Sequence, residues 1–164
     1  MSSAGIRFYG KYRGIVTDNL DPQNLGRIRA RVPAVMGDQE IGWALPCSPY
    51  AGNGVGFFFV PDVDSKVWIE FEGGNIDAPI WTGGFWGIGE VPSMPAIAEV
   101  KMIKTTTATV KLDDTPGVGG ITIETASGMK IVMDSMGIEI SYGSQNIKIS
   151  STNISINNGA LDVM

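Results

Sequence analysis

The C-terminal part of the chain repeats one short pattern, in which two apolar residues flank a single intervening residue. Turn formers such as Ser127-Gly128 and Asn157-Asn158-Gly159 separate the repeats, whose first members lie 7 to 10 residues apart. Each repeat therefore predicts a very short strand with one apolar edge, too small to bury that edge alone. The apolar residues are Ile121, Ile123, Ile131, Met133, Ile138, Ile140, Ile147, Ile149, Ile154, Ile156, Leu161 and Val163.

Stacked repeats leave an apolar stripe along the whole segment, larger than a soluble monomer usually exposes. Either one chain coils into a β-solenoid, or several chains point their apolar pairs at a common axis. A solenoid coil takes about 20 residues or more per turn, whereas a spacing of 7 to 10 residues fits one side of a triangular coil. The spacing favours three chains around one axis, with the twelve apolar residues as the trimer core.

The N-terminal part has a different composition, because it holds every Trp and Phe of the chain. This part is followed, near residues 87–100, by a stretch with Pro92, Pro95 and two glycines, which indicates a linker. Short apolar or alternating runs, separated by Gly- and Pro-rich turns, suggest a small closed barrel. Strands are predicted at residues 6–17, 26–33, 43–45, 56–60, 66–72 and 79–86.

Residues 26–33 alternate strictly between apolar and basic side chains. Ile28, Ala30 and Val32 are predicted to face the barrel interior, and the arginines on either side of them to face outward. A basic stripe on a barrel could bind single-stranded nucleic acid, or it could be a solvated strand face or a contact to an acidic partner. No aromatic residue interleaves the arginines and the net charge is -5, so a solvated face or a partner contact is favoured over nucleic acid. The arginines are Arg27, Arg29 and Arg31.

The residue types disfavour catalysis. The chain has no His, which removes the commonest general base and metal ligand, and its single Cys47 is interpreted as a small barrel residue. The glycine-rich residues 52–56 lead into an apolar run rather than a helix, so they do not form a phosphate-binding loop. We therefore predict no enzymatic activity, no metal and no cofactor.

Two carboxylate pairs allow an alternative, a polysaccharide-degrading or polysaccharide-binding protein of the tailspike kind. Glu70 and Glu72 share a strand face, and Asp113 is adjacent to Asp114. The first pair is more simply an exposed strand face and the second a turn. The four tryptophans could stack on sugars, although barrel packing explains them more simply; they are Trp43, Trp68, Trp81 and Trp86.

Residues 14–33 and 43–86 resemble the OB-fold domain of the phage baseplate assembly protein V and VgrG family, the central spikes of contractile injection systems. The matching motifs include a P-x-V turn, a V-W-x-x-F strand and a P-x-W-x-G hairpin, and residues 111–140 resemble the family's entry into its trimeric β-helix. The chain has Asp64-Ser65 where the family usually has Gly-Asp before the V-W strand. Asp tolerates the left-handed conformation of such a turn better than most residues.

The resemblance implies an all-β chain with an OB-fold barrel at residues 1–88, a linker at 89–100 and an intertwined trimeric β-helix at 101–164. It implies a homotrimeric structural spike that docks on a baseplate hub protein at the OB end, where the three arginines are candidate contacts. The spike would pierce the target cell envelope. Without a His-x-His pair, it would carry a separate PAAR-type tip protein or a metal-free tip. We expect synthesis in the bacterial cytoplasm without a signal peptide, and then a place in a virion baseplate or injection particle. An OB-fold module for single-stranded nucleic acid is the other alternative.

Overall fold

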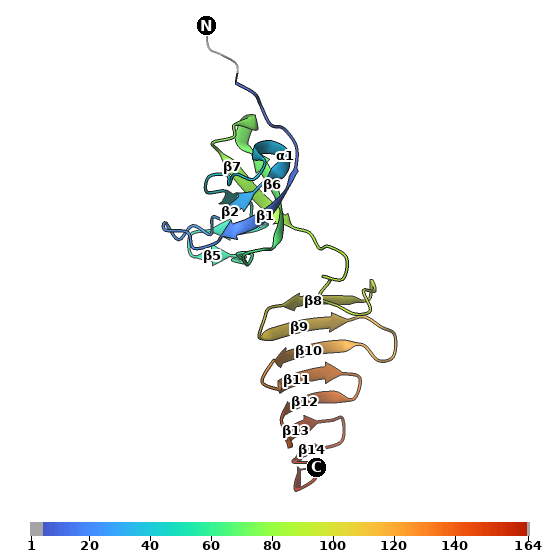
Figure 1. Cartoon of the computed structure of the whole chain (residues 1–164). Helices are drawn as coiled ribbons and strands as arrows, with labels where there is room; N and C mark the ends of the chain where they lie inside the picture. The colour runs from blue at the N-terminus through green and yellow to red at the C-terminus, as the bar shows by residue number, and fades with distance from the viewer. Residues whose placement is uncertain (1–4, 164) are drawn as a thin grey trace. The chain divides into compact units, whose positions relative to one another are not determined.

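The computed structural model describes residues 5–163 (Figure 1). The fold is nearly all β, as predicted; within the described residues, helix is confined to α1 (Pro33–Met36) and the single-turn η1 (Glu72–Gly74). The chain divides into two compact units, Met1–Gly89 and Glu90–Met164. The predicted linker, residues 89–100, lies at this division, and the next strand begins at Val100.

The first unit is a closed barrel of five short strands. In the sheet order β2-β1-β6-β7-β3, neighbouring strands are antiparallel except β3 and β7, which are parallel. A backbone bridge between Ile28 and Ala44 joins the β2 side to the β3 side and closes the circle. This order, with one parallel pair, is that of an OB fold. The strands are β1 (Tyr12–Asp18), β2 (Arg29–Arg31), β3 (Leu45–Pro46), β6 (Lys66–Phe71) and β7 (Pro79–Gly84).

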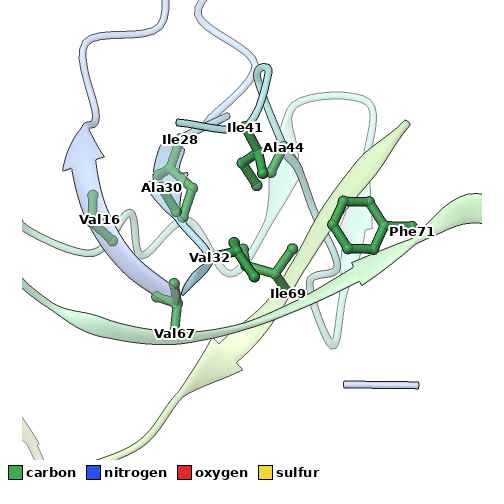
Figure 2. Packing of buried hydrophobic residues seen from close by; sticks show 9 residues of the cluster. All are labelled: Val16, Ile28, Ala30, Val32, Ile41, Ala44, Val67, Ile69 and Phe71. Atoms are coloured by element: carbon green, nitrogen blue, oxygen red, sulfur yellow. The ribbon is translucent and has the colours of Figure 1, made fainter. Parts of the chain in front are cut away.

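The barrel interior holds the buried hydrophobic core (Figure 2). Ile28, Ala30 and Val32 are fully buried, which confirms the alternation predicted for residues 26–33. The same period of two appears in β6, where every second residue is buried, because its alternate side chains face the interior. The core consists of Val16, Ile28, Ala30, Val32, Ile41, Ala44, Val67, Ile69 and Phe71.

Two local predictions for this unit were wrong. Residues 57–60 form no strand; they follow a two-residue hairpin made by β4 (Ala51–Gly52) and β5 (Val55–Gly56). The Phe57 carbonyl accepts a hydrogen bond from Ser48 Oγ (3.0 Å), and the Phe57 amide donates to the Tyr50 carbonyl (2.9 Å), so these groups pair inside the loop rather than with a barrel strand. Cys47 is exposed rather than inside the barrel, because β3 has already left the core at this point.

The turn that departs from the family pattern adopts the left-handed conformation. Asp64 has φ +70°, the region that Asp tolerates better than most non-glycine residues. Its amide donates to the Val16 carbonyl at 3.0 Å, and the Val16 amide donates to the Ser65 carbonyl at 2.9 Å. Asp64, which stands where the family usually has Gly, therefore still forms the turn that leads directly into β6.

The second unit is a single antiparallel sheet in which each strand pairs with the next along the chain (Figure 1). The repeat spacing of 7 to 10 residues thus corresponds to one strand plus one turn. Strand length falls from six residues in β9 to three in β15. The strands are β8 (Val100–Lys104), β9 (Ala108–Asp113), β10 (Gly120–Thr125), β11 (Met129–Asp134), β12 (Gly137–Tyr142), β13 (Gln145–Ile149), β14 (Ile154–Ile156) and β15 (Leu161–Val163).

Candidate trimerisation surface

The twelve apolar residues of the repeats form two continuous columns across β10–β15. Residues directly opposite each other in neighbouring strands lie on the same face of a sheet, so the register places all twelve on one face, called here the apolar face. One column contains Ile121, Met133, Ile138, Ile149, Ile154 and Val163. The other contains Ile123, Ile131, Ile140, Ile147, Ile156 and Leu161.

The apolar face has no cover within one chain. Ile140 is 47% exposed and Leu161 is 56% exposed, and none of the twelve is buried. All hydrophobic residues that are buried among the described ones belong to the barrel unit. A single sheet layer has nothing to pack against and cannot form a core of its own. The face therefore requires another protein surface, or other copies of itself, to exclude water.

The structure adds members that the repeat analysis missed. Val110 and Leu112 of β9 lie opposite Ile123 and Ile121, and Ile103 of β8 lies opposite Val110. The sequence pattern of the repeats is present in β9 as well, because residues 110–112 also place one polar residue between two apolar ones. The column that contains Leu112 ends at a charged residue in β8, because Lys101 lies opposite Leu112. The Lys101 ammonium pairs with a neighbouring carboxylate, that of Asp114.

The opposite face of the sheet is mostly polar. Thr122, Glu139 and Lys148 occupy alternate positions to the apolar residues and so point away from the apolar face. The carboxylate of Glu139 lies 3.8 Å from the ammonium of Lys148 on the next strand. Met102 and Val132 are apolar residues in this row, and both are half-buried. The sheet therefore offers one face to a protein partner and the other to water.

The arginine stripe divides into residues with different surroundings. The Arg27 guanidinium lies 2.6 Å from Asp21 Oδ1, and the two side chains are only 15% and 3% exposed. This guanidinium holds the pKa of Asp21 well below its usual range, and Asp21 in turn raises the pKa of Arg27. Arg29 lies 3.4 Å from Glu40, while Arg31 is exposed. Of the three candidate contacts, Arg31 is thus the most available to a partner.

An aromatic residue does lie against this stripe, although none interleaves it in sequence. The Trp43 ring lies 5.5 Å from the guanidinium carbon of Arg27 and 5.6 Å from that of Arg29. It comes from the segment before β3, which the Ile28–Ala44 bridge brings beside β2. No local sequence signal indicates this contact, because it depends on barrel closure. The Trp43 ring holds the guanidinium groups of Arg27 and Arg29 in place on the barrel surface, and the ion pair with Asp21 also fixes that of Arg27.

The members of the two carboxylate pairs have different surroundings. Glu70 Oε1 lies 2.7 Å from the Lys11 ammonium, and Glu72 begins η1. Asp113 accepts hydrogen bonds from Thr115, which lower its pKa, and Asp114 pairs with Lys101 instead. In residues 5–163 no group of three or more Cys, Asp or Glu side chains is placed to hold a metal ion. Within the same residues, no helix has the length and apolar character needed to cross a membrane.

Comparison with known families agrees with both units. Residues 12–86 match the type VI secretion system/phage-baseplate injector OB domain. Residues 100–162 match the phage baseplate V C-terminal trimerisation domain. A search of curated proteins finds no match. The OB barrel followed by a trimerising sheet defines a structural baseplate protein.

Together the two matches extend over most of the chain. The chain belongs to the phage baseplate V family. Its second unit is accordingly a trimerisation domain, and its family indicates a place in a virion baseplate or an injection particle.

Proposed function

We propose that three copies of this chain form the central spike of a contractile injection machine, without catalytic activity of their own. The observation that carries the proposal is the apolar face: twelve residues in register, all at least partly exposed in one chain, within a trimerisation domain. Three such faces turned toward a common axis would bury one another. Their polar faces would then form the outside of the rod.

This arrangement would resist local opening. Each backbone ladder is completed within one chain, whereas the apolar side chains need all three. Pulling one strand away from the axis would expose apolar surface on three chains together, at about 25 cal/mol for each Å² of apolar surface. Opening would therefore be cooperative along the rod. A component that transmits an axial force into a target envelope needs this property.

The shape of the second unit supports a piercing role. Strands of six residues (β9–β12) are followed by strands of three residues (β14 and β15), so the sheet narrows toward its C-terminal end. Leu161 and Val163, at that end, are more than half exposed. We infer that three copies bury these side chains at the axis, and that a separate tip protein of the PAAR type binds the narrow end beyond them.

The OB unit would dock on the hub. Arg31 provides an exposed charge on its surface, while Arg27 and Arg29 hold Trp43 and their carboxylates. An acidic hub surface would therefore meet Arg31 first. The charge at the β8 end of the apolar face, that of Lys101, is already paired with Asp114, so the proposal places this electrostatic contact at Arg31 and not on that face.

The test is absolute mass by light scattering on the full chain. We expect about three times the 17.5 kDa of one chain. Replacing Ile138 and Ile140 with Asn should abolish the trimer, because both side chains point into the predicted axis. Glu139→Asn is the matched control, since Glu139 lies between them on the polar face and should leave the mass unchanged. A wild-type chain that is monomeric at micromolar concentration would refute the proposal.

A further inference from the structure

The OB unit carries a second apolar surface, formed by a stretch of the chain without charged residues. Residues 41–61 contain no charged side chain. Within them, residues 45–60, called here the aromatic loop, expose their large side chains: Phe58 is 74% exposed, and Phe57 and Phe59 are each 56% exposed. Tyr50 and Val55 are each 55% exposed. Several large apolar residues side by side on a surface indicate a contact site.

A cavity of about 850 Å³ opens beside these rings. Its lining comes from the aromatic loop, from residues 24–26 and from β7, and it includes no charged residue. Cys47, Trp81 and Phe58 all line it, and the Phe58 ring lies over Gly26. A Cβ at Gly26 would meet Phe58 Cε2 at 3.0 Å, so Gly26 permits this close approach. The surface thus combines a protruding ring with an apolar hollow.

The aromatic loop is held in place by polar contacts at its base. Ser48 Oγ lies 3.0 Å from the carbonyl oxygens of both Tyr50 and Phe57. The Cys47 amide donates to the Trp81 carbonyl at 2.9 Å, and Trp81 Nε1 donates to the Gly26 carbonyl at 3.1 Å. The rings of Phe57 and Phe59 stack at 6.1 Å. The exposed rings are therefore preorganised, which lowers the entropic cost of binding.

We propose that the aromatic loop is a contact between the OB units of one trimer, with Phe58 of each copy seated in the cavity of the next. The proposal rests on the proposed trimer. The trimerisation domain on the same chain would hold three OB units together at an effective concentration in the millimolar range. Around a threefold axis each copy must offer two different patches, and the protruding ring and the adjacent hollow are such a pair.

The chemistry of the surface favours another copy over an acidic or basic partner. Interfaces between identical subunits have cores depleted in charged residues and enriched in aromatic ones. The aromatic loop has this composition, whereas the arginine stripe offers the charged contact for a different protein. The OB units would then be linked directly, and the trimer would have two separate apolar contacts, one in each unit.

Cys47 provides a native probe, because it is the single cysteine of the chain, is exposed in one protomer, and lines the cavity. The experiment measures how fast its thiol reacts with a water-soluble disulfide reagent in the full-length trimer. The comparison is the Ile138→Asn, Ile140→Asn variant. All four tryptophans lie in the OB unit, so a cooperative melting transition followed by tryptophan emission shows that this unit is folded in the variant.

We expect the thiol to react at least about tenfold more slowly in the trimer than in the monomeric variant. In a trimeric Phe58→Ser variant the rate should rise toward the monomer value, whereas Ile6→Ser, at a residue 82% exposed outside the loop, should leave it slow. A trimeric mass with equally fast reaction in both proteins would overturn this inference alone, and would mean that the loop is free for a different partner. A slow rate that Phe58→Ser does not change would also overturn it. A monomeric wild-type chain would overturn both this inference and the proposed function.

Discussion

Ile138 of β12 lies directly opposite Ile149 of β13 in the ladder, yet their side chains remain 38% and 41% exposed. The backbone of this pair is hydrogen-bonded within one chain, but its apolar surface is not removed from water. Backbone pairing and hydrophobic burial are therefore separate steps in this unit. The first depends on one chain, whereas the second depends on the surface that covers the apolar face.

Val110 should behave as a member of the apolar face, although it precedes the twelve repeat residues, which begin at residue 121. Val110→Asn would put a polar group into the predicted axis and lose about 2 kcal/mol of burial in each chain. We expect a clear loss of trimer at micromolar concentration and a lower melting midpoint, measured by light scattering and circular dichroism. Lys111→Asn, at the neighbouring position that points away from this face, is the control. Equal effects of the two changes would remove Val110 from the face.

Gly137 should be essential to the turn between β11 and β12. It has φ +136°, and a Cβ there would collide with the carbonyl oxygen of Ile149. Gly137→Ala should therefore disturb both neighbouring strand pairs and lower the melting midpoint strongly. Gly143→Ala is the matched control, because Gly143 has φ +59° but nothing within 4 Å of the added methyl. That change should cost only the conformational penalty, about 1–3 kcal/mol. Similar melting of both variants would show that the close approach is unimportant.

The apolar face could be predicted because it depends on local pattern. Two apolar residues separated by one residue must share a strand face, and turn formers such as Gly143 mark where the chain reverses. The alternation around Ala30 predicted the barrel interior for the same reason. Such features need only the period of the strand and the position of the turns.

Other features depend on contacts that no local pattern specifies. Phe57 belongs to a run with high strand propensity, but its amide pairs with the Tyr50 carbonyl across a loop, and so the predicted strand was wrong. Cys47 is interpreted from the sequence as a small barrel residue, but β3 ends before it and its side chain is exposed. Trp43 reaches Arg27 only after the barrel closes. Tertiary context decided each of these cases.

Arg27 and Arg31 should have separable roles. Arg27→Ala would leave Asp21 without its partner at a nearly buried site, and so should lower the melting midpoint of the OB unit, followed by tryptophan emission. Arg31→Ala removes an exposed charge and should leave that midpoint nearly unchanged. It should instead weaken incorporation into particles, measured as the amount of this chain in purified assemblies. Normal incorporation of the Arg31→Ala chain would exclude this residue as a hub contact.

The pair between Asp21 and Arg27 should make the stability of the OB unit depend on pH. Arg27 and the backbone amides of Gln23 and Leu25 favour the charged form of Asp21, so the pKa of this carboxyl is lowered in the folded protein. A lowered pKa means that the folded state binds the proton less well than the unfolded state. The stabilisation is therefore complete above the ordinary Asp pKa of about 3.9, and is lost as the pH falls from there through the lowered value.

Asp21→Asn tests this dependence because it keeps the shape of the side chain but removes the charge. We expect the variant to melt several degrees below the wild type at neutral pH, as followed by tryptophan emission, and the difference to shrink steadily as the pH is lowered below about 4. Glu40→Gln is the control, because the pair of Glu40 with Arg29 is longer and about two-fifths exposed, and such surface pairs contribute little. A difference between wild type and Asp21→Asn that stays constant down to strongly acidic pH would show that the charge of Asp21 does not stabilise the barrel, and that its role is limited to accepting the backbone hydrogen bonds of residues 23–27.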